Sequence, residues 1–159
     1  MEYRGKAWKF GSNIDTDIII AATHLYTSDP QILRQHCMEG ISPGFCERVN
    51  PGDMIVAGYN FGCGSSREQA PLALKAVSLS CVIAKSFSRL FFRNSINIGF
   101  PIFESAEASD KIEEGDQLIV YPEKGMIMNV TRKEEYRSLI YPEFINTLIL
   151  KGGLLNFIK

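Results

Sequence analysis

The sequence predicts a mixed α/β protein, and three observations lead to that fold class. Residues 54–57 and 81–84 are short apolar runs of the kind that form buried strands, and a helical pattern or a helix cap follows each run. Farther along, residues 114–131 hold two apolar stretches around P-E-K-G, which is typical of an antiparallel hairpin. The 159 residues suit one domain over residues 1–159, because a domain usually takes about 100 to 200 residues. We therefore expect one mixed α/β layer structure without repeats or linkers.

The chain begins with a predicted strand at Tyr3–Phe10, and the motif N-I-D-T-D that follows predicts a polar loop. In T-S-D-P-Q, Ser28 or Asp29 can cap a helix whose first position is Pro30, and Gly40 can end that helix. The side chains that we expect this helix to bury are Leu33, Cys37 and His36.

A turn at Asn50–Asp53 precedes the predicted strand Met54–Ala57, because proline presets φ and glycine takes a positive φ in N-P-G-D. The strand Cys81–Ala84 follows later, and Ser86 can cap a helix that continues to Phe92. Between these two strands, helical spacing predicts a helix that buries Ala70, Ala73, Leu74 and Val77.

The last third of the chain changes character. Ile98–Phe103 is predicted as a further strand, and the hairpin comes after it. A final helix opens at Pro142, runs to about Leu150 and is ended by the glycine pair Gly152–Gly153. The order of elements is therefore alternating strands and helices, then a hairpin, then a helix.

Composition and charge exclude several classes of function. The chain is 45% hydrophobic and 22% charged, as ordinary globular proteins are. Its net charge of -1, without a run of basic residues, leaves no surface for nucleic acid. The N-terminus lacks an apolar signal segment, and no stretch approaches the roughly 20 apolar residues that a membrane span needs. We expect a cytoplasmic protein.

The residues that commonly bind metals are few and scattered. No C-x-x-C pair occurs, so the sequence predicts neither a disulfide framework nor a zinc or iron-sulfur site in this chain. If a metal takes part in the function, another chain must hold it. We interpret His36 as a packing residue of its helix, because lone histidines are usually structural. The four cysteines are Cys37, Cys46, Cys63 and Cys81.

The segment F-G-C-G-S-S-R-E-Q-A-P, Phe61 to Pro71, joins a predicted strand to a predicted helix. Backbone N–H groups at the start of a helix favour an anion, and glycines let that anion come close. Arg67 adds a planar guanidinium that can bind a carboxylate or a phosphate through two hydrogen bonds. The segment is therefore predicted to be an anion-binding loop.

The serines of this loop have a second interpretation. Ser65 and Ser66 both match the capping box, since an acidic or amide side chain follows each of them by three positions. One serine is enough for a cap, which leaves the other hydroxyl free to act as a base or nucleophile among hydrogen-bond donors. A helix capped at either serine would meet Pro71 early, so we expect a short turn over Arg67–Ala70 and the main helix from Pro71.

Cys63 also admits two interpretations. A thiolate near the start of a helix can be reactive, but a small residue suits a tight loop equally, and we favour the small packing residue. A lipase-type nucleophile elbow is excluded, because G-x-S-x-G cannot be drawn through Gly62–Ser66.

Three stretches carry a resemblance to a known family. They are N-I-D-T-D, Y-N-F-G-C-G-S-S-R-E-Q-A-P and V-I-A-K-S-F-S-R-L-F-F-R-N-S-I-N-I-G-F-P. Together they closely resemble the small subunits of the isopropylmalate dehydratase and homoaconitase branch of the aconitase superfamily, over most of the chain. Gln69 stands where many members have histidine, and Ser88 where many have alanine. Neither departure touches the serine-arginine core.

The resemblance implies an α/β fold of the swivelling β/β/α type, with a mixed sheet and flanking helices, that closes over the active site of a separate large subunit. It also implies that the large subunit, and not this chain, holds a [4Fe-4S] cluster. By the family pattern, Ser65 is the base that takes a proton from the carbon next to a carboxylate. Ser66, Arg67 and Gly64 bind the substrate in that pattern, and Asp17 matches an active-site aspartate.

Residues His24, Leu25, Tyr26 and Thr27 resemble the specificity loop of the family. Members whose substrate has an extra carboxylate tend to carry arginine one position after the leucine, where this chain has Tyr26. An uncharged ring cannot neutralise a carboxylate, and it can pack against a branched alkyl group. We therefore favour isopropylmalate over homocitrate-type substrates. A protonated His24 would weaken this preference, and 2,3-dimethylmalate remains open.

The main functional hypothesis is the small subunit of a hydro-lyase that isomerises 2-isopropylmalate and 3-isopropylmalate by dehydration and rehydration in leucine biosynthesis. It should need the large iron-sulfur subunit and a small dicarboxylic acid substrate, and the isolated chain can self-associate. A related dehydratase, acting on 2,3-dimethylmalate or homoaconitate, is the alternative within the class. A non-enzymatic module whose loop binds phosphate is the alternative from another class.

Overall fold

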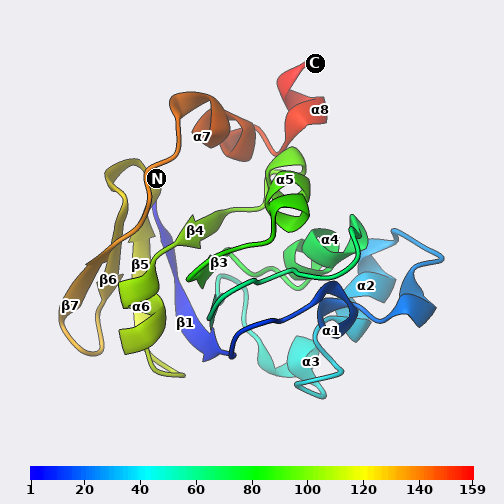
Figure 1. Ribbon diagram of the computed structural model, residues 1–159, viewed down its shortest axis with the longest axis horizontal. Helices are drawn as coiled ribbons and strands as arrows, with labels where there is room; N and C mark the ends of the chain where they lie inside the picture. The colour runs from blue at the N-terminus through cyan, green and yellow to red at the C-terminus, as the bar shows by residue number, and fades with distance from the viewer.

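In a computed structural model of residues 1–159, the chain folds around one seven-stranded mixed sheet (Figure 1). In chain order the strands are β1 (Tyr3–Lys9), β2 (Met54–Ala57), β3 (Cys81–Ala84), β4 (Ile102–Glu104), β5 (Gln117–Tyr121), β6 (Met126–Asn129) and β7 (Glu134–Arg137). Their order in the sheet is β4-β3-β2-β1-β5-β6-β7. The first four strands are parallel. On its other side β1 pairs antiparallel with β5, β5 pairs with β6, and β6 pairs with β7, all antiparallel.

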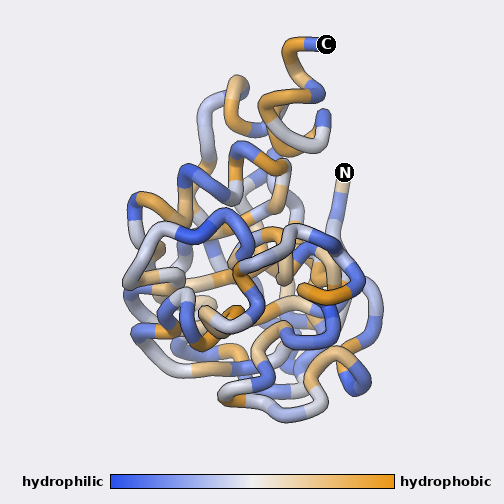
Figure 2. Tube along the Cα trace, turned by 90° about the vertical axis from the view of Figure 1, so that its right-hand side faces the viewer, coloured by the Kyte–Doolittle hydropathy of each residue, from blue (hydrophilic) through white to orange (hydrophobic).

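The helices surround this sheet. They are α1 (Thr16–Ile19), α2 (Pro30–His36), α3 (Phe45–Arg48), α4 (Gln69–Ala76), α5 (Arg89–Asn97), α6 (Ala106–Lys111), α7 (Glu143–Leu150) and α8 (Leu154–Phe157), with the 3₁₀ helices η1 (Ala22–His24) and η2 (Pro122–Lys124). The helices α7 and α8 stand at one end of the molecule beside the C-terminus (Figure 1 and Figure 2). None of the helices combines the length and the apolar character that a membrane crossing requires.

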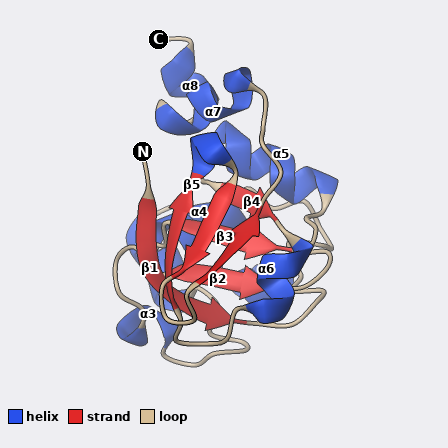
Figure 3. Cartoon of the chain, turned by 90° about the vertical axis from the view of Figure 1, so that its left-hand side faces the viewer, coloured by secondary structure: helices blue, strands red, loops and turns tan.

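The two faces of the sheet belong to two cores, because successive side chains of a strand point to opposite faces. In β2, Ile55 and Ala57 belong to the larger core, which includes buried side chains of helices α1 to α5. Met54 and Val56 belong to the smaller core, together with side chains of β5, β6, β7 and α6. Figure 3 shows α6 in front of the strands on this second face. On this second face, side chains of the antiparallel strands β5 to β7 thus pack against side chains of the parallel strands. Helices α1 to α5 cover the other face.

Most of the predicted elements are confirmed. The strands β1, β2 and β3 and the hairpin of β5 and β6 lie where the sequence predicted them, and α7 follows Pro142. Helix α2 begins at Pro30, where the side chain of Asp29 accepts a hydrogen bond from the backbone N–H of Gln31 (2.9 Å). This helix ends at His36 and not at Gly40, because Cys37 adopts an extended conformation.

Three further details of these elements were wrong. Ser88, and not Ser86, caps α5, which continues past Phe92 to Asn97; the Ser88 hydroxyl accepts from the backbone N–H of Phe91 (3.2 Å). The strand predicted from residue 98 starts only at residue 102, because the preceding segment turns through a glycine at φ 73°.

The third correction concerns N-I-D-T-D, which forms a loop only as far as Asp15. The Asp15 carboxylate caps α1 by accepting from the backbone N–H groups of Asp17 (2.7 Å) and Ile18 (3.2 Å).

Candidate active site

The candidate site lies at the carboxyl ends of the parallel strands, where open α/β sheets usually bind ligands. After β2 ends at Ala57, the chain continues between two other segments. The backbone N–H of Phe61 donates to the carbonyl of Ser86 (3.0 Å), which follows β3. The next backbone N–H, of Gly62, donates to the carbonyl of Ile14 (2.7 Å), which follows β1. The start of the glycine-rich loop is therefore held from both sides, as an extension of the sheet.

The two glycines of the loop have different surroundings. Gly62 has φ 81°, and a Cβ atom there would lie 2.2 Å from Cγ of Phe91, so both the backbone and the packing require glycine. Its carbonyl accepts a hydrogen bond from the Ser88 hydroxyl (2.8 Å). Gly64 has φ 91°, but its nearest neighbour would be Cβ of Asp15 at 3.4 Å, which is an ordinary contact. Glycine is therefore required at position 64 only by the positive φ of the turn, and not by packing.

The capping role considered for the loop serines was wrong. Helix α4 begins at Gln69, two positions before the predicted start at Pro71, and neither Ser65 nor Ser66 caps it. Pro71 falls in the first turn, where a missing N–H costs little. None of the backbone N–H groups of residues 64–69 donates a hydrogen bond within the chain. These free donors make the loop suitable for an anion.

The serine hydroxyls are available at the surface. Ser65 is exposed and its hydroxyl makes no hydrogen bond within the chain, while its carbonyl accepts from the Thr16 hydroxyl (2.8 Å). The Ser66 hydroxyl accepts from the side-chain amide of Asn94 on α5 (3.3 Å). The backbone of Ser65 is thus fixed, and its reactive group is left free.

Arg67 connects the loop to the N-terminal segment. Its Nη1 donates to the carboxylate of Asp17 and to the carbonyl of Ile20 (3.3 Å). The Arg67 side chain is 14% exposed and that of Asp17 is 62% exposed, so solvent reaches this ion pair mainly from the aspartate side. The Nε and Nη2 groups of Arg67 have no partner within the chain, which leaves donors for a ligand. The fold therefore brings Asp17 to the loop that carries Gly64, Ser65, Ser66 and Arg67.

The segment His24–Thr27, predicted as a specificity loop, is attached to the start of α4. The side-chain amide of Gln69 donates to the carbonyl of Leu25 (3.3 Å). Tyr26 is 75% exposed, so its ring is free to contact a ligand or another chain. His24 faces Glu39 and not the serine loop, since His24 Nε2 lies 3.3 Å from the carboxylate.

The cysteines do not fit an iron-sulfur cluster. The structure brings no three of them together, since its one grouping of three possible metal ligands consists of His24, His36 and Glu39. Burial raises the pKa of the Cys63 thiol and the Asp15 carboxylate raises it further, although a backbone hydrogen bond opposes both. A raised pKa keeps this sulfur as a thiol, which supports a packing residue over a reactive thiolate.

Sequence reasoning did not single out Thr16 and Asn94, which hold Ser65 and Ser66. Both residues lie inside the stretches that carried the family resemblance, N-I-D-T-D and the segment from Val82 to Pro101. Their position in those stretches was the available signal, but a single sequence does not show which of their neighbours they contact.

Comparisons with known proteins extend over the whole chain. The aconitase C-terminal domain family matches residues 45–106. The 3-isopropylmalate dehydratase small subunit of Caldanaerobacter subterraneus subsp. tengcongensis is 56% identical over 98% of this chain and 97% of that protein. The 2,3-dimethylmalate dehydratase small subunit of Eubacterium barkeri is 52% identical over 100% of this chain and 98% of that protein.

A solved structure confirms the fold. The crystal structure of 3-isopropylmalate dehydratase from Methanocaldococcus jannaschii has a TM-score of 0.94 and 41% identity, and the match covers 99% of this chain and 93% of that chain. Identity above 50% along the full length confirms the resemblance that the motifs indicated. The chain therefore belongs to the aconitase superfamily, in the family of isopropylmalate dehydratase small subunits.

Proposed function

We propose that this chain is the small subunit of a hydro-lyase that interconverts 2-isopropylmalate and 3-isopropylmalate by dehydration and rehydration, a step of leucine biosynthesis. The observation that carries the proposal is full-length similarity to 3-isopropylmalate dehydratase small subunits, at 56% identity for the relative from Caldanaerobacter subterraneus. The free donors and the free hydroxyl of the loop supply the chemistry that such a reaction needs.

A small subunit implies a large one. Because the cysteines of this chain do not fit a cluster, we assign the [4Fe-4S] cluster to that large subunit. The chain then contributes one side of a shared active site, and it should be inactive alone. The cytoplasm is the expected location of the assembled enzyme.

The proposed roles follow from the positions of the side chains. Ser65 Oγ, as an alkoxide, takes the proton from the carbon next to a substrate carboxylate, a double bond forms, and the hydroxyl leaves the neighbouring carbon as water after an acidic group of the shared active site has given it a proton. Rehydration in the opposite sense returns the hydroxyl to the other carbon. A serine acts as a base only where its alkoxide is stabilised, and the unpaired N–H groups of residues 64–69 are suitably placed donors.

Arg67 is proposed to bind a substrate carboxylate. Its Nη1 is already engaged with Asp17, so the substrate either uses the unpaired Nε and Nη2 groups or shares Nη1 with the aspartate. Asp17 is largely exposed and is proposed to act beside Ser65 in proton transfer. Gly64 and Ser66 complete the proposed binding loop.

The uncharged Tyr26 supports a substrate without a third carboxylate. His24 does not alter this preference, because its Nε2 faces the Glu39 carboxylate at 3.3 Å and not the serine loop. A second candidate substrate is 2,3-dimethylmalate, which the similarity to the Eubacterium barkeri small subunit favours. Both compounds carry small alkyl groups, so the assembled enzyme must be assayed with each. Turnover of homoaconitate as the best substrate would contradict the role of Tyr26.

The test is reconstitution with the large subunit encoded by the same organism. The expected result is no turnover by either chain alone and isopropylmalate isomerisation by the pair. In the pair, Ser65→Ala should lower kcat by about 10²- to 10⁴-fold, which is the usual contribution of a general base. Ser28→Ala is a matched control, because Ser28 is exposed and makes no hydrogen bond.

Two outcomes would contradict the proposal. Full activity of the pair with Ser65→Ala would exclude Ser65 as the base. Phosphate binding by the isolated chain, together with no turnover by the pair on any malate derivative, would favour the anion-binding module instead.

A further inference from the structure

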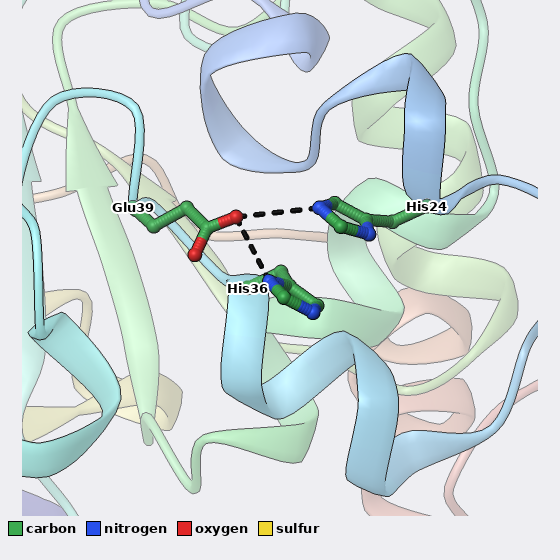
Figure 4. Close-up of side chains that lie close together, drawn as sticks. All are labelled: His24, His36 and Glu39. Carbon is green, nitrogen blue, oxygen red and sulfur yellow. Dashed lines mark hydrogen bonds and ion pairs between the residues drawn. The ribbon is translucent and has the colours of Figure 1, made fainter.

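His24, His36 and Glu39 meet at a partly buried place away from the serine loop (Figure 4). His36 Nδ1 lies 2.8 Å, and His24 Nε2 lies 3.3 Å, from the same carboxylate oxygen of Glu39. The two imidazole rings are stacked, with 3.6 Å between their centroids and 7° between their planes. The three donor atoms lie within 4.8 Å of one another.

The fold holds this cluster together from two sides. His24 ends η1 and His36 ends α2, and Leu33 and Cys37 anchor α2 in the larger core. Met38 then takes a left-handed conformation (φ 59°), which turns the chain so that Glu39 comes back to His36. The backbone N–H of Met38 donates to the carbonyl of residue 19 (2.9 Å), which ties the turn to the segment before η1.

We propose that His24, His36 and Glu39 form a binding site for a divalent transition-metal cation such as Zn²⁺. Two imidazole nitrogens and one carboxylate oxygen are a common donor set for Zn²⁺. In a tetrahedral site with bonds of about 2.1 Å, neighbouring donors lie about 3.4 Å apart. The two distances of 2.8 and 3.3 Å between nitrogen and oxygen are close to that value.

A cation can enter only after the stacked rings turn away from each other, because an imidazole binds a metal in its own ring plane and two parallel rings 3.6 Å apart share no such position. Both ring nitrogens already lie beside the Glu39 carboxylate (Figure 4), and once the cation replaces the protons on these nitrogens, their lone pairs can turn toward the metal. The Glu39 side chain is 41% exposed, so its carboxylate can withdraw about 1 Å to admit the metal. Water completes the fourth position from the solvent side. Each imidazole then binds the metal through the nitrogen that now faces Glu39 and keeps its proton on the other nitrogen.

Without a cation, the end of η1 and the end of α2 are joined at this place by ring stacking and by contacts with the Glu39 carboxylate. A bound cation would join them more strongly. It would connect the end of η1, and with it residues 25–27, to the end of α2. Binding therefore restricts the segment that carries Tyr26. This site is separate from the serine loop, and the inference does not depend on the proposed catalytic activity.

The experiment uses the full chain in a reducing, chelator-free buffer near pH 7.5, with Zn²⁺ added alone. Isothermal titration calorimetry should show one Zn²⁺ per chain. The chain has only His24 and His36 as histidines, so NMR signals of imidazoles report on this cluster alone. Both sets of imidazole signals should shift together in the wild-type chain, and amide exchange of residues 24–27 should slow.

Two pairs of variants provide the controls. Glu39→Gln should weaken Zn²⁺ binding at least about tenfold, since an amide is a poor ligand, whereas Glu47→Gln, an exposed residue nearby in sequence, should leave it unchanged. His24→Gln with His36→Gln should remove the binding event. Cys46→Ser should retain it, because Cys46 is the partly exposed thiol next to α2 and is not a proposed ligand.

Three results would overturn the proposal: imidazole signals that do not move with Zn²⁺, a stoichiometric binding event that survives removal of both histidines, or one that disappears with Cys46→Ser. The NMR titration of the wild-type chain keeps the test valid even where a histidine variant folds poorly.

Discussion

The guanidinium of Arg67 donates a hydrogen bond to the carboxylate of Asp17, although the two residues are 50 positions apart in the chain. The pair joins the serine loop to the segment after β1, at the carboxyl ends of the parallel strands. Ion pairs with one well-exposed partner contribute little to stability, usually about 0 to 1 kcal/mol. We therefore expect this ion pair to fix the position of the Arg67 side chain more than to stabilise the fold. The first two predictions measure the effect on activity and the effect on stability separately.

Arg67→Lys should raise KM of the assembled enzyme about tenfold and change its melting temperature little. Lysine keeps the charge but loses the planar donor set, and one charge-assisted hydrogen bond is worth roughly a factor of ten. Steady-state kinetics with the reconstituted pair measures this effect. Arg137→Lys, on an exposed position of β7, is the matched control. An unchanged KM would show that Arg67 does not contact the substrate.

Asp17→Asn should lower kcat about 10²-fold while the free energy of unfolding changes by less than about 0.5 kcal/mol. Asparagine retains an oxygen for Arg67 but cannot take up a proton. Single-turnover kinetics and urea denaturation of the same preparation give both quantities. A large loss of stability with normal turnover would instead make Asp17 a structural residue.

Gly62→Ala should destabilise the chain by about 3 kcal/mol, because its Cβ would lie 2.2 Å from Phe91 and its φ is 81°. Gly64→Ala should cost only about 1 kcal/mol, since only the positive φ opposes it there. The matched pair distinguishes packing from backbone strain, and urea denaturation midpoints measure both. Equal losses in the two variants would contradict this distinction.

Acid should lower the stability of the chain partly through Asp116, which is buried immediately before β5 and accepts a hydrogen bond from Asn129 at the end of β6. Burial raises the pKa of this carboxyl, but hydrogen bonds from the Glu113 backbone, Asn129 and Arg132 outweigh it and leave the pKa lowered. A pKa lowered by folding gives stability that is present above the unfolded value of about 3.9 and is lost as the pH falls through the folded value.

Asp116→Asn should therefore cost about 2 kcal/mol at pH 7 and less at pH 3, because the wild type loses part of this contribution once the pH is below the unfolded value. Urea denaturation at the two pH values measures the difference. Glu135→Gln, at an exposed position of β7, should show no such change with pH. A difference between wild type and Asp116→Asn that stays constant down to pH 3 would contradict the assigned hydrogen bonds.

Local patterns account for the elements that were predicted well. The strands β2 and β3 are buried at every position, so four consecutive apolar residues gave their bounds correctly. Strand β7 was missed because only Tyr136 in it is buried, and one apolar residue makes no pattern. Helix α6 was also missed, since its sequence A-E-A-S-D-K has little apolar character.

The choice between Ser86 and Ser88 as a helix cap shows where local patterns fail. Both serines stand before the same helical segment and have the same chemistry. Ser86 is unavailable because its carbonyl accepts from Phe61 and its hydroxyl accepts from the backbone N–H of Asn60. These partners come from the loop after β2, about 25 residues earlier, which spacing along the sequence does not reveal.

The succession of most elements along the chain could be predicted from residue types and spacing, and the family from the resemblance of short motifs. These properties depend on neighbours within a few positions or on short motifs. The pairing of Arg67 with Asp17 and the stacking of His24 on His36 could not, because both join segments that meet only when the sheet and its helices pack. The sequence by itself determined which chemical groups each side chain carries. Only the tertiary structure decided which groups meet, because packing of the two cores brings remote segments within hydrogen-bonding distance.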